Sequence, residues 1–127
     1  MIGQLLAGLG VVAGGAALGI RANHRMPVPT DVAAQIRAAL SSGNIPTMEA
    51  VAKAYATTKW KPQCGIVLSA MRAATTASKE PADVKAMYNA TLVSATPATM
   101  RTLAKSYAAK YPVLAGHLND VAKILGG

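Results

Sequence analysis

A duplication constrains the fold of this chain more than any other feature of its sequence. Residues 29–56 and residues 81–108 align without a gap at a shift of 52 positions, with 13 identities in 28 pairs. Because similar segments fold into similar units, the chain is expected to hold two copies of one structural unit. The identical pairs are Pro29/Pro81, Asp31/Asp83, Val32/Val84, Ala34/Ala86, Ala38/Ala90, Leu40/Leu92, Ser42/Ser94, Thr47/Thr99, Met48/Met100, Ala52/Ala104, Lys53/Lys105, Tyr55/Tyr107 and Ala56/Ala108.

The spacing of apolar residues in both copies predicts helices. Val32, Ile36 and Leu40 recur every four residues, and their counterparts are Val84, Tyr88 and Leu92. This spacing places each set on one face of a helix, and no segment alternates with period two for long enough to indicate a strand. We therefore predict an all-α fold of two three-helix units packed together.

Turn residues divide each copy into three expected helices. Gly, Asn and Pro residues separate the apolar segments, as is typical of helix boundaries. A small deletion before the third helix of the second copy is expected to pair Leu68 with Leu118 and Met71 with Val121. The expected helices span residues 31–41, 47–59 and 63–77, then 81–93, 97 to beyond 107, and 113–125.

Polar residues at the helix starts have a structural explanation. Thr30 and Thr96 are suited to accept hydrogen bonds from the first amides of a helix. Asp31 and Asp83 recur at helix starts, and Glu49 falls in an expected first turn, where a negative charge interacts favourably with the helix dipole. The repeated carboxylates therefore indicate helix stabilisation rather than a catalytic pair.

The N-terminal segment differs from the rest of the chain. Residues 1–20 carry no charge, and Gln4 is the only polar side chain among them. A helix of this length measures about 30 Å, the thickness of the hydrocarbon core of a bilayer. Glycines spaced four residues apart allow such helices to pack closely. The two glycine pairs are Gly10/Gly14 and Gly15/Gly19.

We expect the N-terminal segment to form a transmembrane helix. Arg21, His24 and Arg25 follow it, so the rest of the chain is expected on the cytoplasmic or equivalent side. A helix buried in a protein assembly and a cleaved signal peptide are the alternatives. A signal peptide is disfavoured because no positive charge precedes Arg21. The predicted organisation is an apolar helix over residues 1–22, a linker over 23–30, a first repeat over 31–78 and a second over 79–127.

All 13 Lys and Arg and all 5 Asp and Glu follow the apolar segment, and the net charge is +8. Such an excess favours contact with phosphates, anionic lipids or acidic proteins, and it also keeps a protein soluble. The charges are dispersed, which excludes a polybasic tail. The chain has no Phe and is rich in small apolar residues, so a thin core is expected that partner chains or a membrane would complete.

The repeated Ala-Lys-x-Tyr-Ala is the most specific candidate for a contact with an anionic partner. Its tyrosines, Tyr55 and Tyr107, are expected in the core, whereas its lysines point outward. Lysines neutralise phosphates, and aromatic rings stack on bases or lie at interfaces. The predicted anion-contacting lysines are Lys53, Lys59, Lys105 and Lys110, and the predicted interface aromatics are Trp60 and Tyr111.

Few residues are candidates for catalysis or metal binding. Cys64 is the only cysteine, which excludes an internal disulfide, and its apolar neighbours predict burial. His117 and Asp120 lie three positions apart, but two ligands do not form a metal site, and a surface pair is expected. No glycine-rich phosphate loop or nucleophile–base pattern is found. The sequence therefore predicts no enzyme activity, no cofactor, no metal and no small-molecule substrate.

In layout, an apolar glycine-rich segment before a basic helical body, the chain resembles the small Gly/Ala-rich helical proteins that tailed bacteriophages carry inside the virion and eject into the host envelope. The resemblance implies a structural protein, membrane-associated or in the virion, that contacts other assembly subunits. It also implies homo-oligomers with contacts at Gly10, Gly14, Gly15 and Gly19. A membrane-tethered basic module that binds nucleic acid and a cell-envelope adaptor that binds a partner protein remain as alternatives.

Overall fold

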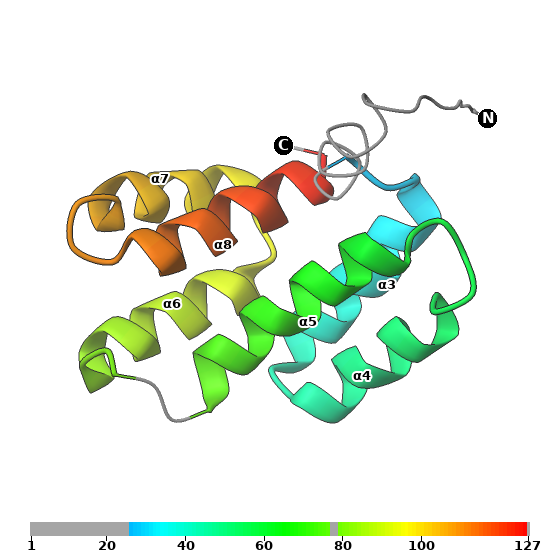
Figure 1. The fold of residues 1–127 in the computed structure, drawn as a ribbon, viewed down its shortest axis with the longest axis horizontal. Coiled ribbons are helices and arrows are strands. Elements are labelled where there is room, and N and C mark those ends of the chain that lie inside the picture. Colours follow the sequence, from blue (N-terminus) through cyan, green and yellow to red (C-terminus); the bar gives the residue numbers. More distant parts are fainter. Residues whose placement is uncertain (1–25, 77–78, 127) are drawn as a thin grey trace, which may run out of the picture.

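A computed structural model of the protein describes residues 26–76 and 79–126. The predicted all-α fold class is confirmed, because this part of the chain holds six helices and no strand. The predicted N-terminal helix, with Gly10, Gly14, Gly15 and Gly19, lies outside the described residues. The helices are α3 (Thr30–Ser42), α4 (Ile45–Ala54), α5 (Lys61–Thr75), α6 (Ala82–Ser94), α7 (Pro97–Tyr107) and α8 (Pro112–Ile124) (Figure 1).

None of these six helices combines the length and the apolar character that crossing a membrane requires. This holds for residues 26–76 and 79–126. The transmembrane helix expected over residues 1–22 therefore stays a prediction.

The duplication is visible in the helix positions. We call α3–α5 the first unit and α6–α8 the second unit. The helices α3 and α6, like α4 and α7, begin 52 residues apart, whereas α5 and α8 begin 51 residues apart. The second unit is thus one residue shorter between the start of its second helix and the start of its third: α7 is one residue longer than α4, and the loop before α8 is two residues shorter than the loop before α5. Buried positions follow the shift of 51, so Val67 is the counterpart of Leu118 and Ala70 is the counterpart of Val121. The expected pairings of Leu68 with Leu118 and of Met71 with Val121 are therefore wrong.

The two units face each other across an approximate twofold axis. Equivalent helices pack together, α3 against α6 and α5 against α8. The Ser41 hydroxyl donates a hydrogen bond to the Val93 carbonyl oxygen at 3.4 Å, and these residues occupy the same position of the repeat, 52 residues apart. Contact between equivalent positions is the property of an interface with twofold symmetry. The symmetry is approximate, because α5 packs against α6 while α3 and α8 make little contact.

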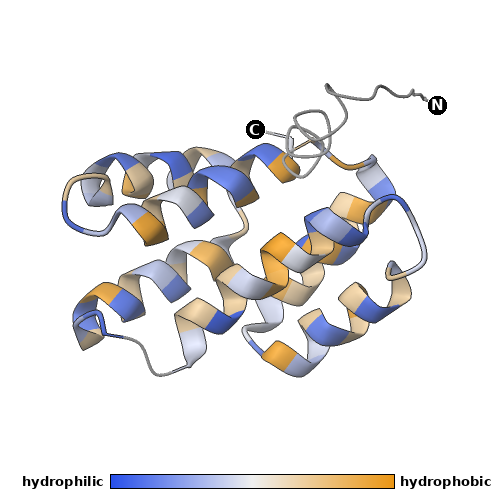
Figure 2. Cartoon of the chain, in the orientation of Figure 1, coloured by the Kyte–Doolittle hydropathy of each residue, from blue (hydrophilic) through white to orange (hydrophobic). Residues whose placement is uncertain are grey.

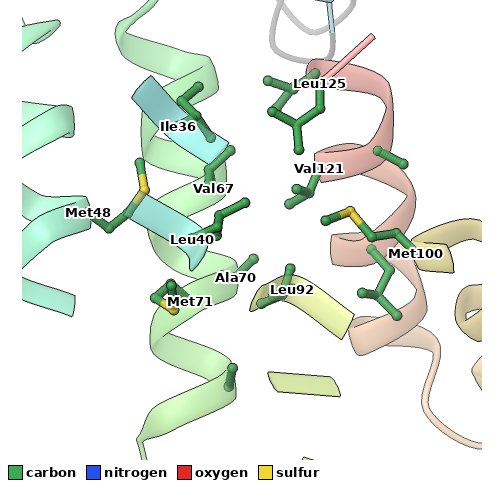
Figure 3. Close-up of a cluster of buried hydrophobic side chains, with 14 of the residues drawn as sticks. Ile36, Leu40, Met48, Val67, Ala70, Met71, Leu92, Met100, Val121 and Leu125 are labelled. Carbon is green, nitrogen blue, oxygen red and sulfur yellow. The ribbon is translucent and has the colours of Figure 1, made fainter. Parts of the chain in front are cut away.

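The hydrophobic core is shared by the units. Figure 3 shows Leu40 and Ala70 of the first unit near Leu92 and Val121 of the second. Hydrophilic and hydrophobic residues are interspersed along each helix, so each helix buries only one face (Figure 2). Each unit therefore covers apolar surface of the other. Fully buried side chains include Ile36, Leu40, Met48, Val67 and Met71 in the first unit and Tyr88, Leu92, Met100, Leu118 and Val121 in the second.

The residues before α3 are attached to the end of α8. The Val28 amide donates to the Ile124 carbonyl oxygen at 3.1 Å, and the Arg37 guanidinium donates to the Leu125 carbonyl oxygen at 2.9 Å. Val28 also packs against the core. Val28 and the start of α3 therefore lie beside the C-terminal end of α8.

Helix capping follows the sequence only in part. Asp31 and Asp83 lie in the first turns of α3 and α6, as expected. Thr30 is not a cap, because Pro29 occupies the N-cap position and Thr30 is already helical. Thr96 stands at the N-cap of α7 without a capping side-chain hydrogen bond; its hydroxyl donates to the Ser94 carbonyl oxygen. Asn44 caps α4 by accepting a hydrogen bond from the Thr47 amide at 2.9 Å.

The helices α3 and α6 end at equivalent residues with left-handed backbone conformation. Gly43 has φ +70° and Ala95 has φ +54°. This conformation costs an L-amino acid roughly 1–2 kcal/mol but is readily adopted by glycine. The first unit therefore has a relaxed helix end where the second unit has a strained one.

Candidate functional site

The two repeated lysines have a structural role that the sequence did not reveal. Lys53 is exposed in the last turn of α4, and Lys105 is exposed in the last turn of α7. A positive charge at this end of a helix interacts favourably with the helix dipole, typically by about 0.3–1 kcal/mol. Helix stabilisation thus accounts for part of their recurrence, and their exposure leaves them accessible to an anionic partner.

The first basic turn consists of Lys53, Lys59, Trp60 and Lys61. Its three lysines are exposed, and Trp60 is half-buried against the core. The Lys59 ammonium lies 5.0 Å from the centroid of the Trp60 ring, within the range of a cation–π contact. The Trp60 carbonyl oxygen accepts a hydrogen bond from the Cys64 amide at the start of α5. The turn therefore presents an aromatic edge surrounded by positive charge on a rigid base.

The second basic turn consists of Lys105, Lys110 and Tyr111. Both lysines are exposed, and Tyr111 is half-buried directly before α8. The Tyr111 ring meets the Tyr107 ring edge to face, with centroids 5.3 Å apart. The Tyr107 hydroxyl donates to the Val84 carbonyl oxygen at 3.4 Å. Tyr107 therefore joins α7 to α6 and supports the Tyr111 ring.

The two basic turns lie at opposite ends of the long axis of the molecule. In Figure 1 the turn after α4 is at the right-hand end and the turn after α7 is at the left-hand end. The fold therefore does not combine the four predicted lysines into one site. It displays two separate basic surfaces that point in different directions.

A depression of about 500 Å³ lies between α5 and α8. It is open to solvent and combines apolar and polar side chains. It contains His117 and Asp120, the pair that the sequence singled out as a surface pair. The described residues that line it are Pro62, Gly65, Ile66, Ser69, His117 and Asp120.

His117 is half-buried and joined to a residue that the sequence analysis did not connect with it. Its Nδ1 atom is 3.2 Å from the hydroxyl of Tyr88, whose side chain is fully buried. Burial lowers the pKa of the His117 imidazole below its ordinary value, although the neighbouring Asp120 carboxylate acts in the opposite direction. Burial also raises the pKa of the Tyr88 phenol, so a neutral imidazole and a neutral phenol share this hydrogen bond near pH 7.

The remaining candidates have structural roles. Cys64 is fully buried as predicted, and burial raises the pKa of its thiol. Glu49 lies beyond the first turn of α4 and forms a 2.8 Å ion pair with Arg72 of α5, so its expected role at the helix dipole is wrong. Within residues 26–76 and 79–126, no three His, Cys, Asp or Glu side chains come together as a metal site would require.

Comparison of the chain with protein-family models, with curated proteins and with solved structures finds no match. The resemblance in layout to bacteriophage ejection proteins therefore stays a hypothesis. A function has to be argued from the two basic turns, the α5–α8 depression and the sequence of the N-terminal segment.

Proposed function

We propose that this protein is a non-enzymatic assembly subunit, membrane-associated or part of a virion. In this proposal the apolar N-terminal segment associates copies of the chain. The six-helix body contacts anionic partners through its two basic turns. The observation that carries the proposal is the position of these equivalent turns at opposite ends of the body (Figure 1). Two similar surfaces that point apart are suited to link two partners, and linkage raises the combined affinity without further contacts.

Charge supports the part of the proposal that concerns the body. The chain has a net charge of +8, and the lysines of both basic turns are exposed. Exposed charges attract an oppositely charged surface over roughly the Debye length, about 8 Å at physiological ionic strength. Binding through these turns is therefore expected to weaken steeply as salt is added.

The glycine spacing supports the part that concerns association. In a helix over this segment Gly10 and Gly14 would fall on one face, and small residues at this spacing bring two helices into close contact. A bulky side chain on that face would separate the helices. In such a helix Leu9 would lie away from both glycine pairs, so a change there should leave the contact intact.

The test compares Gly14→Leu with the control Leu9→Phe in the full chain. Analytical ultracentrifugation in a mild detergent should give an oligomer for the wild type and for the control. Gly14→Leu should reduce the oligomer to monomers at the same concentration. A monomeric wild type, or an oligomer unaffected by Gly14→Leu, would contradict the proposal.

Nucleic-acid binding is a second candidate for the body. It is favoured by the half-buried Trp60 and Tyr111, each beside exposed lysines, since aromatic rings stack on bases and lysines neutralise phosphates. The test measures the affinity of the full chain for single-stranded DNA at several salt concentrations. Lys53→Gln with Lys59→Gln, or Lys105→Gln with Lys110→Gln, should weaken binding and flatten its dependence on salt. The charge-matched control, Lys79→Gln with Lys123→Gln, should have a smaller effect, and equal losses in all three variants would count against this function.

A further inference from the structure

The α5–α8 depression lies where equivalent positions of the two units meet. At the shift of 51 residues that relates α5 to α8, Ile66 corresponds to His117 and Ser69 corresponds to Asp120. All four residues line the same depression. The depression therefore lies close to the approximate twofold axis, and boundaries between helical units are places where ligand sites commonly form.

At two positions near this boundary the second unit carries a polar residue where the first unit carries an apolar one. The counterpart of Tyr88 is Ile36, which is fully buried in α3, and the counterpart of His117 is Ile66, which packs against the core. The first unit folds with two isoleucines, so the helical unit does not require a polar pair here. A buried hydroxyl is costly unless it is hydrogen-bonded, and among the described residues His117 is the hydrogen-bond partner of Tyr88. The polar pair holds the imidazole in a fixed orientation at the wall of the depression.

Gly65 forms part of the wall of the depression. A Cβ atom added at Gly65 would have no heavy atom within 4 Å. Glycine inside a helix is less stable than alanine by about 1 kcal/mol, and packing does not explain its presence at this position. Beside the open space lie the apolar side chains of Pro62 and Ile66. The volume of about 500 Å³ suits a small organic molecule.

The charge of the lining favours a cation. Asp120 is the one formally charged side chain among the described residues that line the depression, in a chain of net charge +8. Asp120 also faces a smaller depression lined by Arg101, Asn119 and Lys123, so its carboxylate is shared between two surfaces. A carboxylate has about four lone-pair sites and can accept several hydrogen bonds at once. Asp120 already interacts with groups of the protein, His117 among them, and its remaining lone pairs can accept a hydrogen bond from a bound ammonium group.

We propose that the α5–α8 depression binds a small amphipathic amine. The apolar part of the ligand lies against Pro62, Gly65 and Ile66, and its ammonium group lies beside Asp120 and His117. This site goes beyond the assembly role, because it uses neither the N-terminal segment nor the basic turns. It also departs from the sequence prediction that the chain binds no small molecule.

The test titrates the full chain with three probes of one shape and follows backbone amide signals by NMR in one detergent. The probes are benzylamine, benzyl alcohol and benzoate, which carry a positive charge, no charge and a negative charge. Saturable shifts are expected in residues 62–69 and 117–120. Affinity should fall from benzylamine to benzyl alcohol, and benzoate should not bind at this site.

Two variants locate the site and are compared with a matched control. Gly65→Leu should fill the depression and weaken benzylamine binding about tenfold or more, the loss expected when a ligand is excluded from its pocket. Gly116→Leu is the control, because Gly116 is the equivalent residue of α8, is exposed and has open space around an added Cβ. Asp120→Asn should weaken benzylamine about tenfold by removing a charge-assisted hydrogen bond, and it should leave benzyl alcohol unchanged.

Three results would overturn the site. The first is the absence of saturable shifts with all three probes at millimolar concentration. The second is equal binding of benzylamine to Gly65→Leu and Gly116→Leu, with both variants giving the amide pattern of the folded protein. The third is an Asp120→Asn variant that keeps full affinity for benzylamine. None of these results concerns oligomer formation, so failure here and failure of the assembly role are distinguishable.

Discussion

In the first unit α3 buries Ile36, whereas in the second unit α6 buries Tyr88 at the equivalent position. At a second pair of equivalent positions, α5 has the apolar Ile66 where α8 has His117. At the helix ends, Gly43 has a relaxed left-handed backbone where the backbone of Ala95 is strained. Met48 and Met100 are identical and equally buried. The units therefore share some core residues, such as Met48 and Met100, and differ at other core positions, at the helix ends and at the boundary between the units. Tyr88, His117 and Ala95 of the second unit are not required by the fold, because the first unit folds with other residues at these positions. The second unit is therefore the better candidate for a specialised role.

The largest expected effect is the loss of stability when a buried methionine that both units share is truncated. Met48→Ala and Met100→Ala each remove a fully buried side chain, which typically costs about 2–5 kcal/mol of unfolding free energy. Because the core is shared, each variant should shift a single transition in chemical denaturation by a similar amount. Two separate transitions, with each variant shifting only one of them, would show that the units unfold independently.

A smaller effect is expected at the polar pair of the second unit. Tyr88→Phe leaves Nδ1 of the half-buried His117 without its phenol partner, which should cost about 1–3 kcal/mol in chemical denaturation. Tyr107→Phe is the matched control, since its hydrogen bond to Val84 is longer and its side chain is only half-buried. An equal or larger loss of unfolding free energy in Tyr107→Phe would show that the Tyr88–His117 contact contributes no more to stability than the Tyr107–Val84 contact.

The residue types at the ends of α3 and α6 can be exchanged between the two units. Ala95→Gly should stabilise the protein by about 1 kcal/mol, because glycine removes the strain at φ +54°. Gly43→Ala should destabilise it by a similar amount through the same strain; an added Cβ would be 3.7 Å from a Val93 methyl, an ordinary contact. Melting temperatures of the two variants should move in opposite directions. Movement in the same direction would show that the two helix ends are not equivalent.

The smallest expected effect is the contribution of His117 to the pH dependence of stability. Burial lowers the pKa of His117 in the folded state relative to about 6.5 in the unfolded chain, so the unfolded chain binds protons more readily in this range. The contribution of His117 is therefore present above about pH 6.5 and is lost as the pH falls toward the folded pKa. His117→Ile, which restores the residue type of the first unit, should make stability less dependent on pH between about 5 and 7. A wild type more stable at pH 5.5 than at pH 7 would contradict this sign.

Local patterns in the sequence predicted the helices well. The spacing of Val32, Ile36 and Leu40 reports which face of one helix is apolar, and the structure places all three in the core. The same spacing made Tyr88 look like an ordinary core residue, although it contacts His117 of another helix. That contact depends on how the units are arranged in space, which the repeat alone does not specify. For the same reason the one-residue shortening before α8 and the separation of the basic turns emerged only from the structure.

The arrangement of the two units is tested most directly by distances between spin labels. Labels on Ser41→Cys and Val93→Cys should show strong dipolar broadening, because these equivalent residues touch across the axis. Labels on Lys53→Cys and Lys105→Cys should show no such broadening and should give a long distance by pulsed methods, because they lie at opposite ends of the body (Figure 1). Cys64 is fully buried and should remain unlabelled. A short distance between the labels at residues 53 and 105, or no broadening between those at 41 and 93, would contradict the twofold arrangement on which the account rests.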